Sequence, residues 1–283
     1  MLSFLARTAL AELLFLEAFV ACYVLAHRFL SREPTALRWV GVVVCGAVLS
    51  TIGFHLLRAI NAFHLLGATL YQTLVTMAVL QLGGGSGGLR QWFVRDLRFI
   101  HKLHQRYRCS SYRQVAVALA VVSLPIVIRP LILPPMGWDS LTYHAVKPAM
   151  WVQYAGMLRM DGPGTWAYSA PLWAGGEIFT AWAMLPFHSD LLATAVDAVE
   201  WLALGLALIA LARELGIREP HASVTAAFAL AIPTLRISVG SGYVEIDCLE
   251  DGPATFPGIG HPGRDAVERL IFFESLHCEV EKP

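Results

Sequence analysis

The chain has 283 residues, of which 56% are hydrophobic and only 15% charged, and its formal net charge is zero. Ordinary water-soluble domains carry about 25% charged residues, so this composition excludes most of them, and disordered chains as well. Because no net positive charge attracts polyanions, we expect no nucleic-acid partner. The composition favours a protein of the membrane.

Apolar runs of membrane-spanning length recur along the chain, and a membrane helix needs about 20 mostly apolar residues. Six segments meet or approach that length: 4–27, 39–57, 63–82, 115–135, 190–212 and 221–238. A further apolar segment, 169–187, fits either a seventh span or a helix at the membrane surface. The predicted fold is all-α: a polytopic transmembrane helical bundle of about six spans, with an outer loop of short amphipathic helices.

The loop 83–114 predicts the orientation, because it carries seven cations against a single acid, Asp96. Lys and Arg gather in loops on the cytoplasmic side, so we place this loop in the cytoplasm. The cations that follow the first and fifth segments then lie on the same side. Segment 136–189 faces outward, to the periplasm or exterior of a bacterial inner (plasma) membrane. The basic stretch itself reads as an amphipathic helix resting on anionic membrane lipids.

The outer segment 136–189 concentrates aromatic residues, with five of the eight Trp and three of the eight Tyr. Rings of this kind favour the membrane–water interface, which explains most of them. Their faces also stack on sugar rings, so the same residues suit a glycan site.

Polar side chains are densest at Asp139-Ser140-Leu141-Thr142-Tyr143-His144, followed by Lys147. A carboxylate at the membrane edge is partly desolvated and is therefore a stronger base. On a helix, Asp139 and Tyr143 share a face, as do Tyr143 and Lys147. Asp139 also suits the N-cap of a helix. It is therefore either a cap or a catalytic base, and the residue pattern alone favours the cap.

The run GWDSLTYHAVKPAMWVQYAGML resembles the first outer loop of C-type membrane glycosyltransferases, which have the GT-C fold. It is most similar to the bacterial families of the dolichyl-phosphate-mannose-protein mannosyltransferase and RgtA/B/C/D types. Asp139, Tyr143 and His144 match the D-S-L-x-Y-H-like run of these families position by position. Weaker likeness comes from Tyr-Ser-Ala-Pro at 168–171, from Glu177 and from Tyr-Val-Glu-Ile-Asp at 243–247.

The resemblance implies a membrane glycosyltransferase that takes a sugar from a polyprenyl-phosphate-linked donor. The acceptor would be a lipid, a glycan or a protein on the outer face of the membrane. Asp139 would act as general base on the acceptor hydroxyl. Direct displacement of the phosphate would then invert the anomeric carbon.

The remaining site residues follow from the same resemblance and from charge. Tyr143, His144 and Lys147 would position the donor phosphate or the acceptor. Arg129 could bind a lipid phosphate through its guanidinium, although snorkelling to the interface explains it as well. Glu245 or Asp247 would assist directly or through a divalent metal ion. No cofactor is certain, because metal use differs among GT-C enzymes.

The resemblance divides the chain into four regions: 1–82 with three N-terminal spans, the basic loop 83–114, the GT-C-like core 115–247 and the tail 248–283. Ten of the 36 tail residues are charged, against 32 of the 247 residues before them. We expect a frameshifted or truncated C-terminus, with a genuine soluble tail as the alternative. Activity of the chain as given is therefore doubtful. The alternative function is an inactive remnant or a non-enzymatic membrane scaffold.

Overall fold

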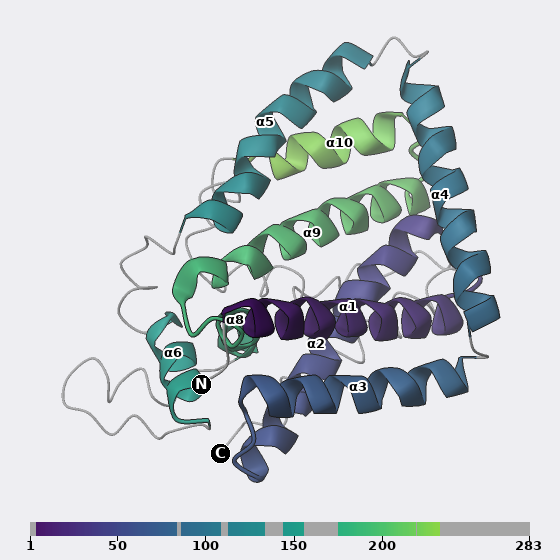
Figure 1. Ribbon diagram of the computed structural model, residues 1–283. Coiled ribbons are helices and arrows are strands. Elements are labelled where there is room, and N and C mark those ends of the chain that lie inside the picture. Colours follow the sequence, from purple (N-terminus) through teal and green to yellow (C-terminus); the bar gives the residue numbers. More distant parts are fainter. Residues whose placement is uncertain are drawn as a thin grey trace, which may run out of the picture.

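The computed structural model describes residues 4–83, 86–108, 113–133, 144–155, 175–218 and 220–232. This part of the chain is a bundle of helices without a strand (Figure 1), which confirms the all-helical fold for the residues described. The helices are α1 (Phe4–Phe29), α2 (Thr35–Ala59), α3 (Leu65–Leu82), α4 (Ser86–Arg108), α5 (Arg113–Ile132), α6 (Val146–Gln153), α8 (Gly175–Met184), α9 (Ala195–Glu214) and α10 (His221–Leu230), with a 3-10 turn, η2, at Asp190–Leu192.

Four helices in the described residues, α1, α2, α3 and α9, are long and apolar enough to cross a membrane. They match four of the predicted segments. Their ends have local causes: Pro34 directly precedes α2, and His64 caps α3. His64 Nδ1 accepts a hydrogen bond from the Gly67 backbone N–H at 3.1 Å. This bond satisfies one of the N–H groups that the first turn of a helix leaves without an intrahelical partner.

Large apolar side chains cover the outside of these helices. In the most apolar 18-residue window of each of the four, no more than 39% of the residues are buried. Along one face of α3, the exposed fractions are 53% for Leu66, 57% for Leu70, 68% for Leu74 and 55% for Met77. A continuous apolar face of this kind is unfavourable in water, whereas lipid tails cover it without cost. The long apolar helices therefore indicate an integral membrane protein.

The prediction of about six spans is not confirmed. Residues 115–132 of segment 115–135 lie in α5, which has Pro125 and Pro130 inside it. Among the residues whose side chains are described, Ser123–Ile132 is a shorter apolar helix. Helix α10 has 10 residues, and so does α8, which covers part of 169–187. At 1.5 Å per residue such a helix reaches about 15 Å, half the thickness of the hydrocarbon core. Spans at 115–135 and 221–238 therefore stay predictions, and α8 alone is too short to be a seventh.

The two ends of the bundle differ in character. Helix α1 packs against α2 and α3, and α9 packs against α2, α5 and α10. In Figure 1, α4 lies across the C-terminal ends of α1, α3 and α9, roughly perpendicular to them. The α1–α2 turn and the C-terminus of α9 lie at this α4 end, whereas α6 and α8 lie at the opposite end. The α1–α2 turn, α4 and the C-terminus of α9, which carry the cations predicted to share one side, therefore lie at one end of the bundle, and the cytoplasmic location of this end stays a prediction.

Helices α3 and α8 meet the same turn of α2. The Tyr71 hydroxyl donates a hydrogen bond to the backbone oxygen of Leu49 at 2.9 Å, and Trp182 Nε1 donates to that of Ser50 at 3.0 Å. Gly53 lies one turn further along α2, where a Cβ atom would collide with the Tyr71 ring and press on Trp182. This glycine permits the close approach of three helices.

Candidate functional site

Helices α6 and α8, the described helices of segment 136–189, are seated in an apolar core that the first three helices help to build. The Phe54 ring of α2 lies with its centroid 4.8 Å from that of Phe63 and 5.2 Å from that of Trp151 in α6. Trp182 of α8 joins the same cluster through an edge-on contact with Phe63. Both helices are short, as expected, but their amphipathic character is not confirmed, because the side chains 181–184 of α8 are all buried.

Three ionisable side chains meet where α6 and α8 begin. His144 Nδ1 lies 3.0 Å from Glu177 Oε1, and Lys147 Nζ lies 3.7 Å from the same oxygen. Glu177 is 1% exposed and Lys147 is 2% exposed. We call these three residues the Glu177 cluster. It joins the first turn of α6 to the first turn of α8 across the intervening segment of the chain.

The position of Glu177 favours a charged carboxylate in spite of its burial. Glu177 lies in the first turn of α8, where the unpaired N–H groups of the helix carry partial positive charge. Lys147 supplies a full positive charge from the other side. Transferring an ion out of water costs several kcal/mol, so a buried Glu or Lys persists only when it is paired in this way.

One carboxylate oxygen of the Glu177 cluster is not used. Within the described residues, Glu177 Oε2 is buried and has no hydrogen-bond partner. Buried polar atoms of native proteins are nearly always paired, so an exception indicates a functional role or a missing partner. Oε2 can accept a hydrogen bond from a hydroxyl, while the Lys147 ammonium beside Oε1 suits an anion. The arrangement therefore offers both an acceptor and a positive charge.

The structure brings together two of the predicted site residues, His144 and Lys147. Arg129 lies on α5 with an exposed side chain, and no contact among the described residues joins it to the Glu177 cluster. The other predicted site residues lie outside the described residues: Asp139, Tyr143, Glu245 and Asp247.

Sequence reasoning missed Glu177 as a site residue, since it entered only as part of the family resemblance. The available signal was its setting: it is the one carboxylate in the apolar, aromatic stretch between Trp173 and Trp182. A Glu in such a stretch is almost never buried without a partner, and Lys147 is the nearest cation before it in the sequence apart from Arg159.

A half-buried carboxylate lies within the long apolar helices. Glu17, near the middle of α1, accepts a hydrogen bond on Oε2 from Thr73 Oγ1 at 2.8 Å. Thr76 Oγ1 donates to the backbone oxygen of Glu17 at 3.0 Å. Both threonines belong to α3, so this polar contact fixes α1 against α3.

No group of three or more His, Cys, Asp or Glu side chains in the described ranges is placed to hold a metal ion. Comparisons with protein-family models, with curated proteins and with solved structures find no match for this chain.

Proposed function

We propose that this chain forms the donor site of a GT-C-type membrane glycosyltransferase. The enzyme would transfer a sugar from a polyprenyl-phosphate-linked donor to a lipid, glycan or protein acceptor on the outer face of a bacterial inner membrane. The observation that carries this proposal is the Glu177 cluster, which lies at one end of an apolar bundle. His144 of this cluster is the last residue of the run DSLTYH, and Lys147 follows three residues later. The likeness of that run to GT-C enzymes supports it.

Each residue has a role in this proposal. Asp139 removes the proton from the acceptor hydroxyl as its oxygen attacks the anomeric carbon. The bond between that carbon and the phosphate oxygen breaks, and polyprenyl phosphate leaves with the electron pair. Lys147 provides positive charge for the phosphate, and His144 helps to position it. Glu177 is a positioning residue, because it touches both side chains and holds them at the start of α6.

Donor binding tests the proposal. The protein is placed in lipid nanodiscs, and binding of radiolabelled polyprenyl-phosphate-mannose is compared with binding of the polyprenyl alcohol. Saturable binding that requires the phosphate is expected for the wild-type protein. Lys147→Met is expected to weaken binding by about 10-fold or more, since it removes a charge-assisted contact. The matched control is Arg58→Met, which removes an exposed cation on α2.

Two outcomes contradict the proposal. One is that the wild-type protein binds the donor no better than the alcohol. This comparison uses the wild-type protein alone and requires no variant. The other is that Lys147→Met binds as tightly as Arg58→Met. Unfolding curves of both variants, recorded in the same detergent, show whether a change in binding accompanies a change in fold.

A specific observation favours a second candidate, a membrane scaffold or inactive remnant. Lys147 and Glu177 are both buried and pair with each other, so together they can tie α6 to α8 without any ligand. A scaffold predicts that Lys147→Met lowers stability while neither the variant nor the wild-type protein binds the donor.

A further inference from the structure

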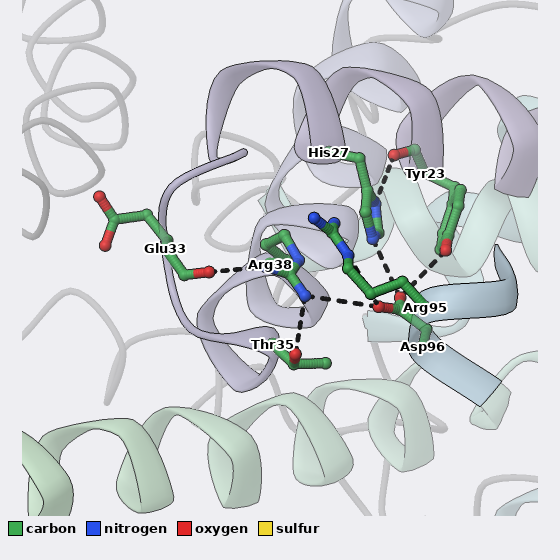
Figure 2. Close-up of polar contacts among 7 residues, drawn as sticks. All are labelled: Tyr23, His27, Glu33, Thr35, Arg38, Arg95 and Asp96. Carbon is green, nitrogen blue, oxygen red and sulfur yellow. Dashed lines mark hydrogen bonds and ion pairs between the residues drawn. The ribbon is translucent and has the colours of Figure 1, made fainter. Parts of the chain in front are cut away.

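The single acid of α4 is buried and satisfied by groups on other helices. Asp96, 2% exposed, accepts hydrogen bonds on Oδ2 from the Tyr23 hydroxyl at 3.0 Å and from His27 Nε2 at 2.9 Å. Arg38 donates to Oδ1 at 3.4 Å. Figure 2 shows Asp96 enclosed by these side chains of α1 and α2. Arg95 of α4, which is exposed, also approaches Asp96, with its Nε 3.9 Å from Oδ1. Asp96 therefore anchors α4 to the bundle, and Arg95 is the one exposed cation of α4 that pairs with it among the described residues.

A cavity of about 780 Å³ lies beside this anchor, between the start of α2 and α4. Five cations line it: Arg38 from α2, and Arg90, Arg95, Arg98 and Lys102 from α4. No acidic side chain is among its described lining residues. Glu33 lies nearby in the chain, but Arg38 contacts only its backbone oxygen, and its carboxylate points away in Figure 2.

The most buried of these cations is held in place by its two terminal nitrogens, while its third nitrogen has no partner among the described residues. Arg38 is 5% exposed, and its two terminal nitrogens donate to the Glu33 backbone oxygen, the Thr35 hydroxyl and Asp96. Its Nε has no hydrogen-bond partner in the described part of the chain. Asp96 balances part of the charge of Arg38 and Arg95, whereas no described carboxylate pairs with Arg90, Arg98 or Lys102. These three cations repel one another unless an anion lies between them. Guanidinium groups match the oxygens of a phosphate in a fork, so phosphate is the anion that this set favours.

The faces of α4 indicate where the phosphate comes from. Leu89, Trp92 and Asp96 pack on α1 and α2. The next stripe around the helix is apolar and exposed, with exposed fractions of 51% for Phe93, 49% for Leu97 and 53% for Ile100. Cations on one side and apolar side chains on the other are typical of a helix lying in the membrane surface. A helix in that position places its cavity at the level of lipid headgroups.

We propose that the cavity between the start of α2 and α4 binds the phosphate of an anionic membrane-lipid headgroup. This binding site is independent of the Glu177 cluster, which lies at the opposite end of the bundle.

Native mass spectrometry of the protein in a neutral detergent tests this proposal by titration with phosphatidylglycerol or phosphatidylcholine. The wild-type protein is expected to bind phosphatidylglycerol about 10-fold more tightly. The variant Arg90→Gln, Arg98→Gln, Lys102→Gln removes three cavity charges and is expected to bind it about 100-fold more weakly. The matched control is Arg32→Gln, Arg213→Gln, Arg218→Gln, which removes three exposed cations at the same end.

Glycerol 3-phosphate and inorganic phosphate serve as soluble competitors and distinguish a lipid from a free phosphate. We expect these competitors to displace phosphatidylglycerol only when they are in large excess, because they lack the acyl chains that contact the apolar stripe. Displacement at equimolar concentration would overturn the assignment to a lipid. Equal losses in the cavity variant and the control, or equal affinity for the two lipids, would overturn the site itself. The comparison of the two lipids on the wild-type protein requires no variant to fold.

Discussion

Three carboxylates inside the bundle each join helices that are distant in the sequence. Glu17 connects α1 to α3, Asp96 connects α4 to α1 and α2, and Glu177 connects the beginnings of α6 and α8. A buried ion pair adds little net stability compared with apolar residues of the same size. Removing one partner of the Asp96 or Glu177 ion pairs, however, leaves an uncompensated charge, so these two contacts discriminate strongly against other arrangements of the helices. Glu17 is half-buried and is held by hydrogen bonds from threonines.

Glu177→Gln is expected to lower the free energy of unfolding by about 3–5 kcal/mol, because the buried Lys147 then loses the counter-charge of Glu177. The measurement is chemical unfolding in detergent. Adding Lys147→Met to Glu177→Gln should restore much of the loss, since both charges of this pair are then absent. Glu12→Gln, on the exposed side of α1, is the control and should change little. Equal stability of Glu177→Gln and Glu12→Gln would contradict the buried pair.

Asp139→Asn separates the two roles that the residue pattern leaves open for Asp139. A catalytic base predicts that sugar transfer from a radiolabelled polyprenyl-phosphate donor, in membranes where the protein supports it, falls by about 100-fold or more. Donor binding should stay unchanged, because the base acts on the acceptor. A helix cap predicts normal transfer, because Asn caps about as well as Asp. Transfer at the unmutated rate would remove Asp139 from the proposed mechanism.

At the scale of elements, α2 is the helix around which the others are arranged. It contacts α1, α3, α8 and α9, and its Gly53 lies against Tyr71 and Trp182. Tyr71 of α3 and Trp182 of α8 also donate hydrogen bonds to backbone oxygens of α2, which requires α3 and α8 to lie close to α2. Any side chain at position 53 must therefore separate α2 from α3 and α8.

Gly53→Ala is expected to lower the free energy of unfolding by about 1–3 kcal/mol, the usual effect of overpacking a core. Gly46→Ala, on the same helix, is the matched control. The nearest atom to a Cβ there is Cys22 Sγ at 3.7 Å, an ordinary contact. Because alanine is the better helix former by about 1 kcal/mol, Gly46→Ala should be neutral or stabilising. Thermal unfolding of the two variants in one detergent compares them, and the reverse order would contradict the packing described.

The elements differ in how well sequence predicts them, for physical reasons. Length and apolar composition are local properties, so α1, α2, α3 and α9 were predicted to within a few residues of their bounds. Segment 115–135 has the composition of a span, and its residues up to Ile132 lie in the helix α5, with Pro125 and Pro130 inside it. Helices α6 and α8 are short and buried by partners from 1–82, a long-range contact with no local signature.

The same reason explains which site residues were found. His144 and Lys147 were predicted from the density of polar residues around them, which is visible in the sequence. Their joint contact with Glu177 depends on how α8 packs against α6. In the sequence, Asp96 is a single acid in a basic, amphipathic stretch. Only the packing of α4 on α1 and α2 shows that it is buried.

At the scale of the whole molecule, the bundle has two chemically different ends. One end carries α4 with its cation-lined cavity, together with the α1–α2 turn and the C-terminus of α9. The other end carries α6 and α8 with the Glu177 cluster. Between them lie helices with apolar outer faces. We propose that a membrane separates the two ends, with the Glu177 cluster outside.

Cysteine accessibility tests this claim most directly. In a background in which the five native cysteines are replaced, Ile60→Cys introduces a thiol beyond the end of α2, where Ile60 is 71% exposed. Ser31→Cys introduces one in the exposed α1–α2 turn at the α4 end. A membrane-impermeant maleimide applied to intact spheroplasts is expected to label Ile60→Cys and to reach Ser31→Cys only after permeabilisation. Labelling of Ser31→Cys in sealed spheroplasts with protection of Ile60→Cys would place the Glu177 cluster in the cytoplasm and contradict the claim.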